Sequence, residues 1–504
     1  MKRALISVFD KTNILSLAHW LVSKNVEIIS TGGTYRYLKE NHIPVVKVSD
    51  VTGFNEMLDG RVKTLHPMIH GGILARRDQI SHMQDLINNH INPIDFVVVN
   101  LYPFAEKLAE NLPFDELIEF IDIGGPSMLR SAAKSFKDVV VLSDQQDYTK
   151  VMQEIDEQGE LSFASRKSLA AKVFNLTSHY DALISQYLME DKIPDYLTLT
   201  YQKNNTMRYG ENAHQQAFYY VDQSRQGAMN NFVQLGGKDL SFNNVRDMDL
   251  AWKVVSEFNE NEIVCCAVKH STPCGVALGD SVLTAYIKTV LADSVSIFGG
   301  IVAFNHQVDA YTALELTQIF LEIVIAPSFT QEALDILREK KNLRIIQCQQ
   351  KAQQKWEMIQ VDGGILMQQA DQQLLDNLEQ VTKAGVTEKQ KEDLIFALKV
   401  AKFVKSNAIV VAKDGQTLGI GGGEVSRIWA AEKALERAQK FAEENVVMAS
   451  DAFFPFADVV ELAAKNNVTA IIQPGGSIRD KDVIKVADEN NIAMLFSHIR
   501  HFKH

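Results

Sequence analysis

The N-terminal part of the chain alternates between short apolar segments and segments with a helical apolar stripe. Strands are predicted over residues 4–8, 26–30, 96–100 and 139–142, and helices over residues 14–22 and around residues 128–133. Strands and helices that alternate in this way are typical of a mostly parallel sheet covered by helices. The pattern therefore predicts an α/β domain, in which ligands usually bind at the carboxyl ends of the strands.

The chain has 504 residues, too many for a single hydrophobic core. A polar stretch between residues 184 and 207 precedes a new apolar pattern, so we predict two domains, covering residues 1–195 and 196–504. A second polar region, residues 347–391, is interpreted as a solvated surface connection, and it could also separate two subdomains of the C-terminal part. The sequence has no short internal repeat and no heptad array.

Composition narrows the class of protein. No apolar run approaches the roughly 20 residues that span a bilayer, and the N-terminus is predicted to be a first strand rather than a signal peptide. The formal net charge of −12 argues against general nucleic-acid binding, although locally concentrated basic residues could still bind an anion. The 4 cysteines do not suggest a disulfide framework, which fits a reducing cytoplasm.

Two N-terminal segments are candidates for binding such an anion. The glycine-rich turn at residues 31–34 joins a predicted strand to a helix, where backbone N–H groups and the helix N-terminus attract negative charge. An ordinary strand–helix turn capped by threonine is the alternative. Further on, Arg61 and Lys63 are two residues apart and share a face in extended backbone, beside Thr64. They could grip a phosphate, or they could belong to a basic edge strand.

A third group of polar residues follows the apolar residues 96–99. Asn100 and Tyr102 stand at the predicted end of that strand, and Gly124 with its neighbouring glycine leads into a helix that carries Lys134. Asp122, Lys134, Tyr102 and Lys63 are expected to form a compact acid–base set. Each of them could instead be a buried polar residue or a surface charge.

The C-terminal part contains a Lys-His pair after an apolar strand predicted at residues 263–266. Lys269 beside His270 would favour the neutral imidazole that a base requires, whereas a surface lysine next to a hydrogen-bonded histidine is the alternative. Zinc chemistry of the deaminase type is rejected, because that pattern needs a second cysteine three residues after the first. Cys274 is followed by Gly275, Val276 and Ala277 instead.

The ordered motifs of both parts resemble one bifunctional family, which joins AICAR transformylase to IMP cyclohydrolase in purine biosynthesis. The N-terminal motifs are SVFDKT (7–12), TGGT (31–34), GRVKTLHP (60–67), NLYPF (100–104) and IDIGG (121–125). The C-terminal motifs are RYGENAHQ (208–215), LSFNN (240–244), AVKHSTPCG (267–275), FGG (298–300), IAP (325–327), SNA (406–408), GIGGG (419–423), SDAFFPF (450–456) and QPGGS (473–477). The resemblance implies a methylglyoxal-synthase-like N-terminal α/β domain, followed by a transformylase domain of two cytidine-deaminase-like α/β subdomains without the metal.

For the N-terminal domain, the resemblance implies ring closure of formyl-AICAR to IMP with loss of water. The implied catalytic residues are Lys63, Tyr102, Asp122 and Lys134. The implied nucleotide-binding residues are Ser7, Lys11, Thr31, Gly33, Thr34, Arg61, Thr64, Asn100 and Gly124.

For the C-terminal domain, the resemblance implies formyl transfer from 10-formyltetrahydrofolate, as a co-substrate, to the amine of AICAR. His270 is then the proton-transfer residue, Lys269 its electrostatic partner and Asn407 the group that orients the formyl group. Arg208, Tyr209 and Arg500 are implied on the nucleotide side, and Ile420, Phe453 and Pro455 form part of the folate wall. The glycines at 421–423 form either a turn that a ligand approaches closely or a tight hairpin.

The resemblance further implies a cytoplasmic homodimer without a catalytic metal, acting on small molecules and not on nucleic acid or membranes. Two other classes of function are weighed against it. A sensor that only binds could dispense with Lys63, Asp122 and His270, all of which are present. A lyase acting on small phosphorylated sugars would use the glycine-rich turn, but it leaves the second half of the chain unexplained.

Overall fold

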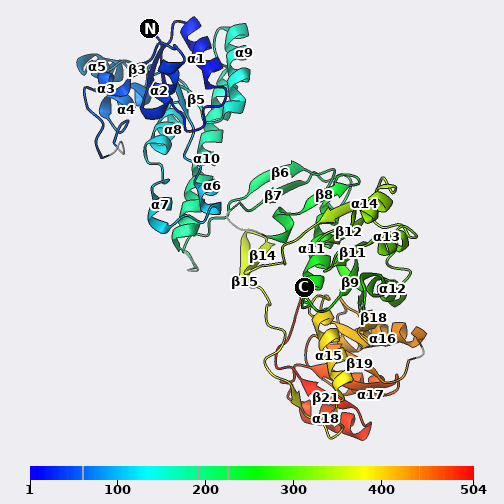
Figure 1. Ribbon diagram of the computed structural model, residues 1–504. Helices are drawn as coiled ribbons and strands as arrows, with labels where there is room; N and C mark the ends of the chain where they lie inside the picture. Colours follow the sequence, from blue (N-terminus) through cyan, green and yellow to red (C-terminus); the bar gives the residue numbers. More distant parts are fainter. Residues whose placement is uncertain (59–61, 190–192, 224–226, 442) are drawn as a thin grey trace. The chain divides into compact units, whose positions relative to one another are not determined.

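The computed structural model describes residues 1–58, 62–189, 193–223, 227–441 and 443–504. Contacts between residues divide the chain into two compact units (Figure 1). Unit 1 comprises residues 1–202 and 222–224, and unit 2 comprises residues 203–221 and 225–504. Each unit is described by itself below.

Unit 1 is built on a five-stranded parallel sheet in the order β3-β2-β1-β4-β5. Its strands are β1 (Arg3–Ser7), β2 (Glu27–Ser30), β3 (Val46–Lys47), β4 (Phe96–Val99) and β5 (Val140–Leu142). Its helices are α1 (Ile14–Ser23), α2 (Gly32–Glu40), α3 (Val48–Thr52), α4 (Pro67–Leu74), α5 (Ile80–Asn88), α6 (Phe104–Ala109), α7 (Phe114–Ile118), α8 (Gly124–Lys134), α9 (Tyr148–Gln158) and α10 (Phe163–Met189). The predicted α/β alternation is confirmed, with shifts of one or two residues at element ends.

The central strands of unit 1 are apolar because helices cover both of their faces. Leu5 and Ile6 of β1, and Val97 and Val98 of β4, are all buried, although neighbouring side chains of a strand point to opposite faces. The sequence of such a strand is a continuous apolar run rather than an alternation of apolar and polar residues. The polar residues that follow these runs therefore emerge together at the carboxyl edge of the sheet.

Unit 2 contains a 12-stranded sheet in the order β16-β21-β20-β19-β17-β18-β10-β9-β11-β12-β13-β8. These strands are β8 (Val233–Gly236), β9 (Val264–Lys269), β10 (Thr272–Leu278), β11 (Ile301–Phe304), β12 (Ile323–Ala326), β13 (Arg344–Gln347), β16 (Glu379–Gln380), β17 (Ile409–Lys413), β18 (Gln416–Gly421), β19 (Val446–Ser450), β20 (Val468–Gln473) and β21 (Ala493–Phe496). The helices are α11 (Phe242–Ser256), α12 (Val282–Ala292), α13 (Ala310–Leu316), α14 (Gln331–Arg338), α15 (Glu388–Ala401), α16 (Arg427–Ala438), α17 (Asp458–Ala464) and α18 (Asp480–Glu489). Separately, β6 (Gln202–Thr206) pairs with β7 (Phe218–Val221).

The large sheet is a structural duplication that the sequence does not reveal as a repeat. Each half runs helix, antiparallel hairpin, helix, strand, helix, strand, helix, strand: α11 to β13 in the first half and α15 to β21 in the second. In each half the hairpin is followed by parallel strands, and a short antiparallel strand, β8 or β16, closes the outer edge. The two hairpins meet at the centre, where β10 pairs with β18.

Equivalent glycines show how closely the duplication is kept. A Cβ atom added to Gly275 on β10 would lie 2.5 Å from the carbonyl oxygen of Thr289 on α12. A Cβ atom added to Gly419 on β18 would lie 1.9 Å from the carbonyl oxygen of Ala434 on α16. In both halves, then, glycine lets the helix that follows the hairpin pack directly onto the strand backbone.

The polar region at residues 347–391 connects the two halves, but it is not a plain surface connection. It contains an antiparallel hairpin of β14 (Trp356–Val361) and β15 (Gly364–Gln369), and it ends in the edge strand β16. The region is mostly exposed and separates the two halves, as predicted, but its hairpin was not identified from the sequence. Its missed signal was Asp362-Gly363 between two strand-like segments, which is the most favourable sequence for a two-residue hairpin turn.

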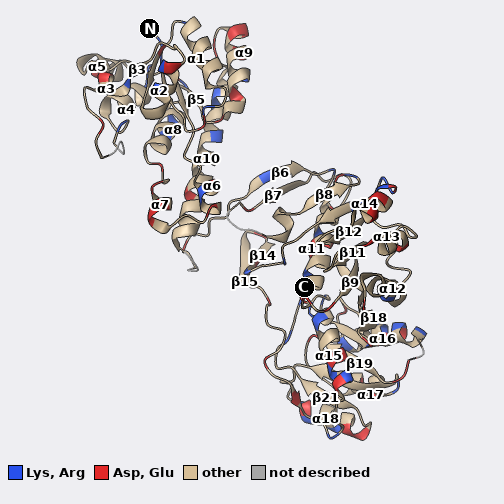
Figure 2. Cartoon of the chain, viewed as in Figure 1, with Lys and Arg blue, Asp and Glu red and all other residues tan. Residues whose placement is uncertain are grey.

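Two ion pairs link the halves of unit 2 through lysines at the C-terminal end of α15. Figure 2 shows residues of both charge signs on α15. Lys399 Nζ lies 3.0 Å from a Glu262 oxygen, and Lys402 Nζ lies 2.9 Å from a Glu257 oxygen. Both lysines are buried and belong to the second half, whereas both glutamates belong to the first. The ammonium groups are satisfied by partners, which buried charges require.

The four cysteines, Cys265, Cys266, Cys274 and Cys348, are unpaired thiols. Among the helices that the structure describes, none is long and apolar enough to cross a membrane. Within the same described residues, no group of three or more His, Cys, Asp or Glu side chains is arranged to hold a metal ion.

Candidate active sites

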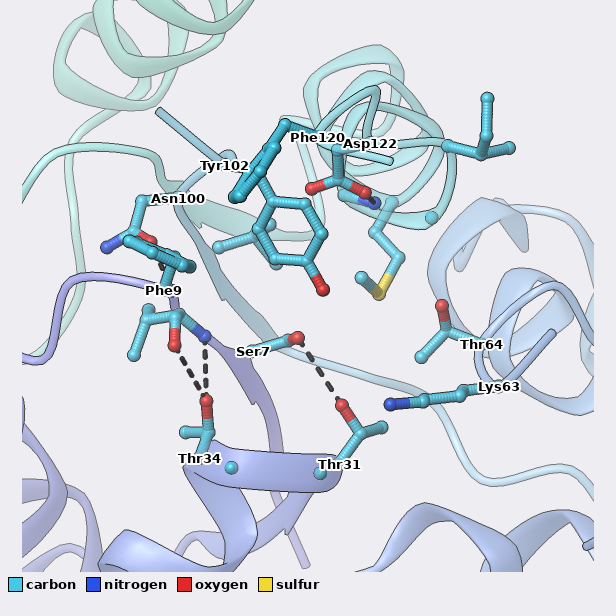
Figure 3. Close-up of a pocket in the computed structure, with 18 of the residues that line it drawn as sticks. Ser7, Phe9, Thr31, Thr34, Lys63, Thr64, Asn100, Tyr102, Phe120 and Asp122 are labelled. Atoms are coloured by element: carbon cyan, nitrogen blue, oxygen red, sulfur yellow. Dashed lines mark hydrogen bonds between the residues drawn. The ribbon is translucent and has the colours of Figure 1, made fainter. Parts of the chain in front are cut away.

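Unit 1 has a cavity of about 730 Å³ at the carboxyl edge of its sheet (Figure 3). Its walls come from the segments after β1, β2 and β4 and from the N-termini of α2 and α8. The residues singled out from the sequence that line it are Ser7, Lys11, Thr31, Gly33, Thr34, Lys63, Thr64, Asn100, Tyr102, Asp122 and Gly124. Most of the N-terminal candidates are therefore brought together in one place.

One wall of the cavity is suited to an anion. Thr31 precedes α2, and the hydroxyls of Ser7 and Thr31 lie 3.4 Å apart at the cavity surface. Gly32 has φ of 50°, and a Cβ atom there would lie 3.2 Å from Lys63 Nζ. The lysine ammonium group thus sits directly over the start of the helix, where the backbone N–H groups already favour negative charge.

Two of the candidate residues hold the loops of this wall. The Thr34 hydroxyl donates to the carbonyl oxygen of Val8 at 2.9 Å and lies 3.0 Å from the Val8 backbone N–H group. The Asn100 side chain accepts hydrogen bonds from the backbone N–H groups of Phe9 and Asp10 and donates to the Asp10 carbonyl at 2.8 Å. These contacts fix the loop that carries Lys11.

The opposite wall carries an acid–base pair. Burial raises the pKa of the Asp122 carboxyl, although hydrogen bonds from backbone N–H groups, including that of Gly125 at 2.8 Å, act in the other direction. Burial also raises the pKa of Tyr102, and the nearby Asp122 carboxylate adds to this effect. In Figure 3 the Tyr102 hydroxyl and the Lys63 ammonium group both point into the cavity.

Glycines let this wall approach its partners closely. A Cβ atom at Gly125 would lie 2.3 Å from Asp122 Oδ2, and one at Gly124 would lie 3.1 Å from Thr64 Oγ1. The Asp122 backbone N–H group donates to the Tyr180 hydroxyl at 2.9 Å, and that hydroxyl donates to the Phe120 carbonyl. Tyr180 therefore holds the Asp122 backbone, while the Gly125 backbone N–H group holds its carboxyl.

In unit 2, the candidate residues gather at one end of four neighbouring strands. Lys269 ends β9, and His270 with Ser271 forms the two-residue turn into β10. The strand order β9-β10-β18-β17 and the antiparallel pairings bring this turn to the same end of the sheet as Gly421 and the segment before β17. Asn407 belongs to that segment.

Both Lys269 and Asn407 are fixed by backbone carbonyls. Lys269 Nζ donates to the Phe298 carbonyl oxygen at 2.6 Å, and the Asn407 side-chain amide donates to the Glu424 carbonyl oxygen at 2.7 Å. Next to Asn407, the Ser406 hydroxyl donates to Asp451, whose carboxylate is paired with the buried Arg427. His270 itself is exposed.

Comparison with known proteins decides the family. A family model described as "AICARFT/IMPCHase bienzyme" matches residues 132–437, and a model described as "MGS-like domain" matches residues 13–127. The chain belongs to the AICARFT/IMPCHase bienzyme family. The fold class is therefore an MGS-like α/β domain followed by the AICARFT/IMPCHase domain, as the sequence predicts, whereas the deaminase-like character of the subdomains stays a prediction.

Relatives named "Bifunctional purine biosynthesis protein PurH" match along their whole length. One from Fusobacterium nucleatum is 65% identical over 504 residues, covering 100% of both chains, and one from Clostridium botulinum strain Kyoto is 60% identical with the same coverage. A solved structure titled "Crystal structure of ForH" is 35% identical over 37% of this chain and 97% of that chain, with a TM-score of 0.34. The predicted function is confirmed: the chain is a bifunctional enzyme of purine biosynthesis, with AICAR formyltransferase and IMP cyclohydrolase activities.

One member of the expected acid–base set of this family lies elsewhere. Lys134 is the last residue of α8, is exposed, and does not line the cavity that Gly124 at the start of the same helix lines. Ten residues of α-helix separate two ends by about 15 Å. Within one chain, Lys134 therefore does not join the other three residues at this cavity, and its catalytic role stays a prediction. Arg61 lies outside the described residues.

The cavity also has an apolar lining that the sequence did not single out. It includes Val8, Val99, Ile118, Phe120 and Met128. Phe9 packs edge-on against Tyr102, with ring centroids 5.5 Å apart. Apolar residues of this kind have no distinctive spacing, and only their position beside the polar motifs could have indicated them.

The remaining C-terminal candidates differ in accessibility. Arg208 and Arg500 are exposed, and their guanidinium groups lie 5.5 Å and 4.8 Å from the ring centroids of Tyr209 and Phe502. Phe453 is half-buried and Pro455 is exposed, whereas Ile420 is 3% exposed and packs in the core. The glycines at 421–423 connect β18 to α16, so the tight-hairpin alternative is wrong.

Proposed function

We propose that the cavity of unit 1 is the site of IMP cyclohydrolase. The observation that carries the proposal is that one wall of the cavity is suited to an anion and the facing wall carries proton-transfer groups. Lys63 over the N-terminus of α2 offers a place for a phosphate-bearing nucleotide, and Tyr102 with Asp122 offers groups that move protons. A nucleotide bound by its anion to the first wall would present its base to the second.

The pKa directions support distinct roles for the two proton-transfer groups. Ring closure requires the carboxamide nitrogen of formyl-AICAR to attack the formyl carbon and lose a proton. The former formyl oxygen then leaves as water, while the formamide nitrogen loses its own proton and forms the C=N bond of the new ring. Asp122, with its raised pKa, is a stronger base than an ordinary aspartate, so it accepts the proton. Tyr102 stays protonated at neutral pH and donates to the departing oxygen.

The other candidates of unit 1 are proposed to hold the nucleotide. Backbone and hydroxyl donors near α2 and α8 bind its phosphate, and Thr34 and Asn100 act by fixing the loop of Lys11. The proposed binding residues are Ser7, Lys11, Thr31, Gly33, Thr34, Arg61, Thr64, Asn100 and Gly124.

We further propose that formyl transfer takes place at the sheet end of unit 2, with 10-formyltetrahydrofolate as the co-substrate. His270 moves the proton of the AICAR amine, Lys269 provides the neighbouring positive charge, and Asn407 orients the formyl group. The nucleotide side consists of Arg208, Tyr209 and Arg500, and the folate wall consists of Phe453 and Pro455, with Ile420 behind them in the core.

Several organisational features belong to the same proposal. The two activities are assigned to residues 1–195 and 196–504, the latter with two deaminase-like subdomains that use no metal. The enzyme works in the cytoplasm, which its four unpaired thiols support. It acts on small molecules as a homodimer, which light scattering of the purified protein would test.

The decisive experiment measures both activities separately in reciprocal variants. Lys63→Met should abolish conversion of formyl-AICAR to IMP and leave formyl transfer intact, and His270→Ala should do the reverse. Lys150→Met, which removes an exposed lysine of α9, controls for loss of one positive charge in unit 1. Loss of both activities in either variant, with folding preserved by circular dichroism, would contradict the assignment of separate sites.

A further inference from the structure

The duplicated halves of unit 2 share a side-chain contact as well as their topology. In the first half, the Asp247 carboxylate accepts the backbone N–H group of Ser271 at 2.7 Å and the Ser271 hydroxyl at 3.1 Å. In the second half, the Asp393 carboxylate accepts the backbone N–H group of Gly415 at 2.7 Å. Ser271 and Gly415 are the second residues of the two hairpin turns.

The two carboxylates occupy the same place in their helices. Asp247 is the sixth residue of α11 and Asp393 the sixth residue of α15. Each helix precedes the hairpin of its own half and packs against it, so the same geometry recurs where the surrounding sequence differs. The contact between the helix aspartate and the hairpin turn is thus a repeated feature of the duplicated unit.

The turn of the first half needs such support more than the other. His270 and Ser271 have φ of 52° and 54°, a left-handed conformation that is energetically unfavourable for residues with a Cβ atom. In the second half the corresponding turn ends in Gly415, which adopts φ of 65° without that penalty. A two-residue turn with both φ values positive also sets the direction of its first side chain, here His270.

We propose that Asp247 is a positioning residue for formyl transfer, which holds the Lys269–His270 turn in its productive geometry through Ser271. The proposal rests on the assignment of proton transfer to His270. One end of the pair is already fixed, because Lys269 donates to the Phe298 carbonyl. Asp247 fixes the other end, so that the exposed imidazole of His270 is aimed by the backbone rather than by packing.

Asp393 provides a control, since it also accepts the backbone N–H group of the second turn residue, together with that of Asp414 at 3.0 Å, and its turn carries no residue assigned to the reaction. Asp247→Ala should lower kcat for formyl transfer by about 10- to 100-fold, the size expected when a catalytic group is misplaced by about 1 Å, with little change in KM. Asp247→Asn keeps an oxygen acceptor for the Ser271 N–H group and should recover most of the rate. Asp393→Ala should lower the thermal midpoint at least as much and leave kcat within about twofold.

A double-variant cycle with His270→Ala separates positioning from general stability. In the His270→Ala background, Asp247→Ala should reduce the residual rate no further, whereas a purely structural role would give additive losses. Equal losses of kcat in Asp247→Ala and Asp393→Ala, or an unchanged kcat in Asp247→Ala, would overturn the inference. Full transfer activity in His270→Ala alone would instead overturn the proposed role of His270.

Discussion

The cavity of unit 1 and the sheet end of unit 2 surround their candidate residues differently. In unit 1, side chains from separate segments converge on a cavity of about 730 Å³, and burial shifts the pKa of Tyr102 and Asp122. In unit 2, His270, Arg208 and Arg500 are exposed, and hydrogen bonds to backbone carbonyls fix Lys269 and Asn407. Burial thus shifts acid–base strength in the cavity of unit 1, whereas the site proposed in unit 2 would depend on how turns and loops orient its side chains.

The strongest test of this difference removes the buried carboxylate. Asp122→Asn should lower the rate of IMP formation by about 10²–10⁴-fold, the usual contribution of a general base, because the amide cannot accept the carboxamide proton. Formyl transfer should stay unchanged. Stopped-flow measurement of formyl-AICAR conversion gives the rate, and near-wild-type cyclisation would show that the base is another group.

A gentler change displaces the same carboxylate without removing it. Gly125→Ala would place a Cβ atom 2.3 Å from Asp122 Oδ2, so the carboxyl must move. We expect a loss of about 10²-fold in cyclisation, as for a misplaced catalytic group. Gly385→Ala, where a Cβ atom meets nothing within 4 Å, is the control and should leave both activities intact. Equal effects of the two variants would contradict the close approach of Gly125 to Asp122.

These residues also show how far the sequence could lead. The alternation of strands and helices predicted a parallel sheet, and polar residues that follow its strands meet at one edge, so a binding site at that edge could be anticipated. Lys134 could not be placed in the same way. It follows Gly124 closely in sequence, but the axis of α8 carries it away from the cavity. The direction of a helix relative to a sheet is set by packing, which no motif records.

The duplication in unit 2 was expected from the family resemblance alone and left no recognisable sequence repeat, for a related reason. The turns His270-Ser271 and Asp414-Gly415 have no residue type in common. Both nevertheless have positive φ values, and both donate a backbone N–H group to an aspartate at the sixth position of a helix. Backbone geometry is repeated there while side chains have diverged. The hairpin β14–β15 is hard to recognise because the polar composition of residues 347–391 masks its strands, and only Asp362-Gly363 indicates the turn.

The pH dependence of cyclisation should reflect the raised pKa values of the buried Asp122 and Tyr102. Since Asp122 must be ionised and its pKa is raised, activity should rise with pH through an apparent pKa above that of an ordinary aspartate. Since Tyr102 must be protonated and its pKa is also raised, activity should fall only above pH 10. Rate profiles of wild type and Tyr102→Phe would test this, because the alkaline limb should disappear in the variant.

The smallest expected effect is on stability, and it has the opposite sign to the effect on activity. A carboxyl whose folded pKa lies above its unfolded value favours folding at low pH, and that contribution is lost as the pH rises through the folded pKa. At neutral pH the ionised Asp122 therefore destabilises unit 1, and Asp122→Asn should raise the thermal midpoint by a few °C. Below about pH 4 the difference should vanish, because the carboxyl is then protonated in both states. Calorimetry at pH 7 and below pH 4 measures the difference in thermal midpoint between the variant and wild type. A variant less stable than wild type at pH 7 would mean that hydrogen bonds stabilise the ionised carboxylate more than burial destabilises it.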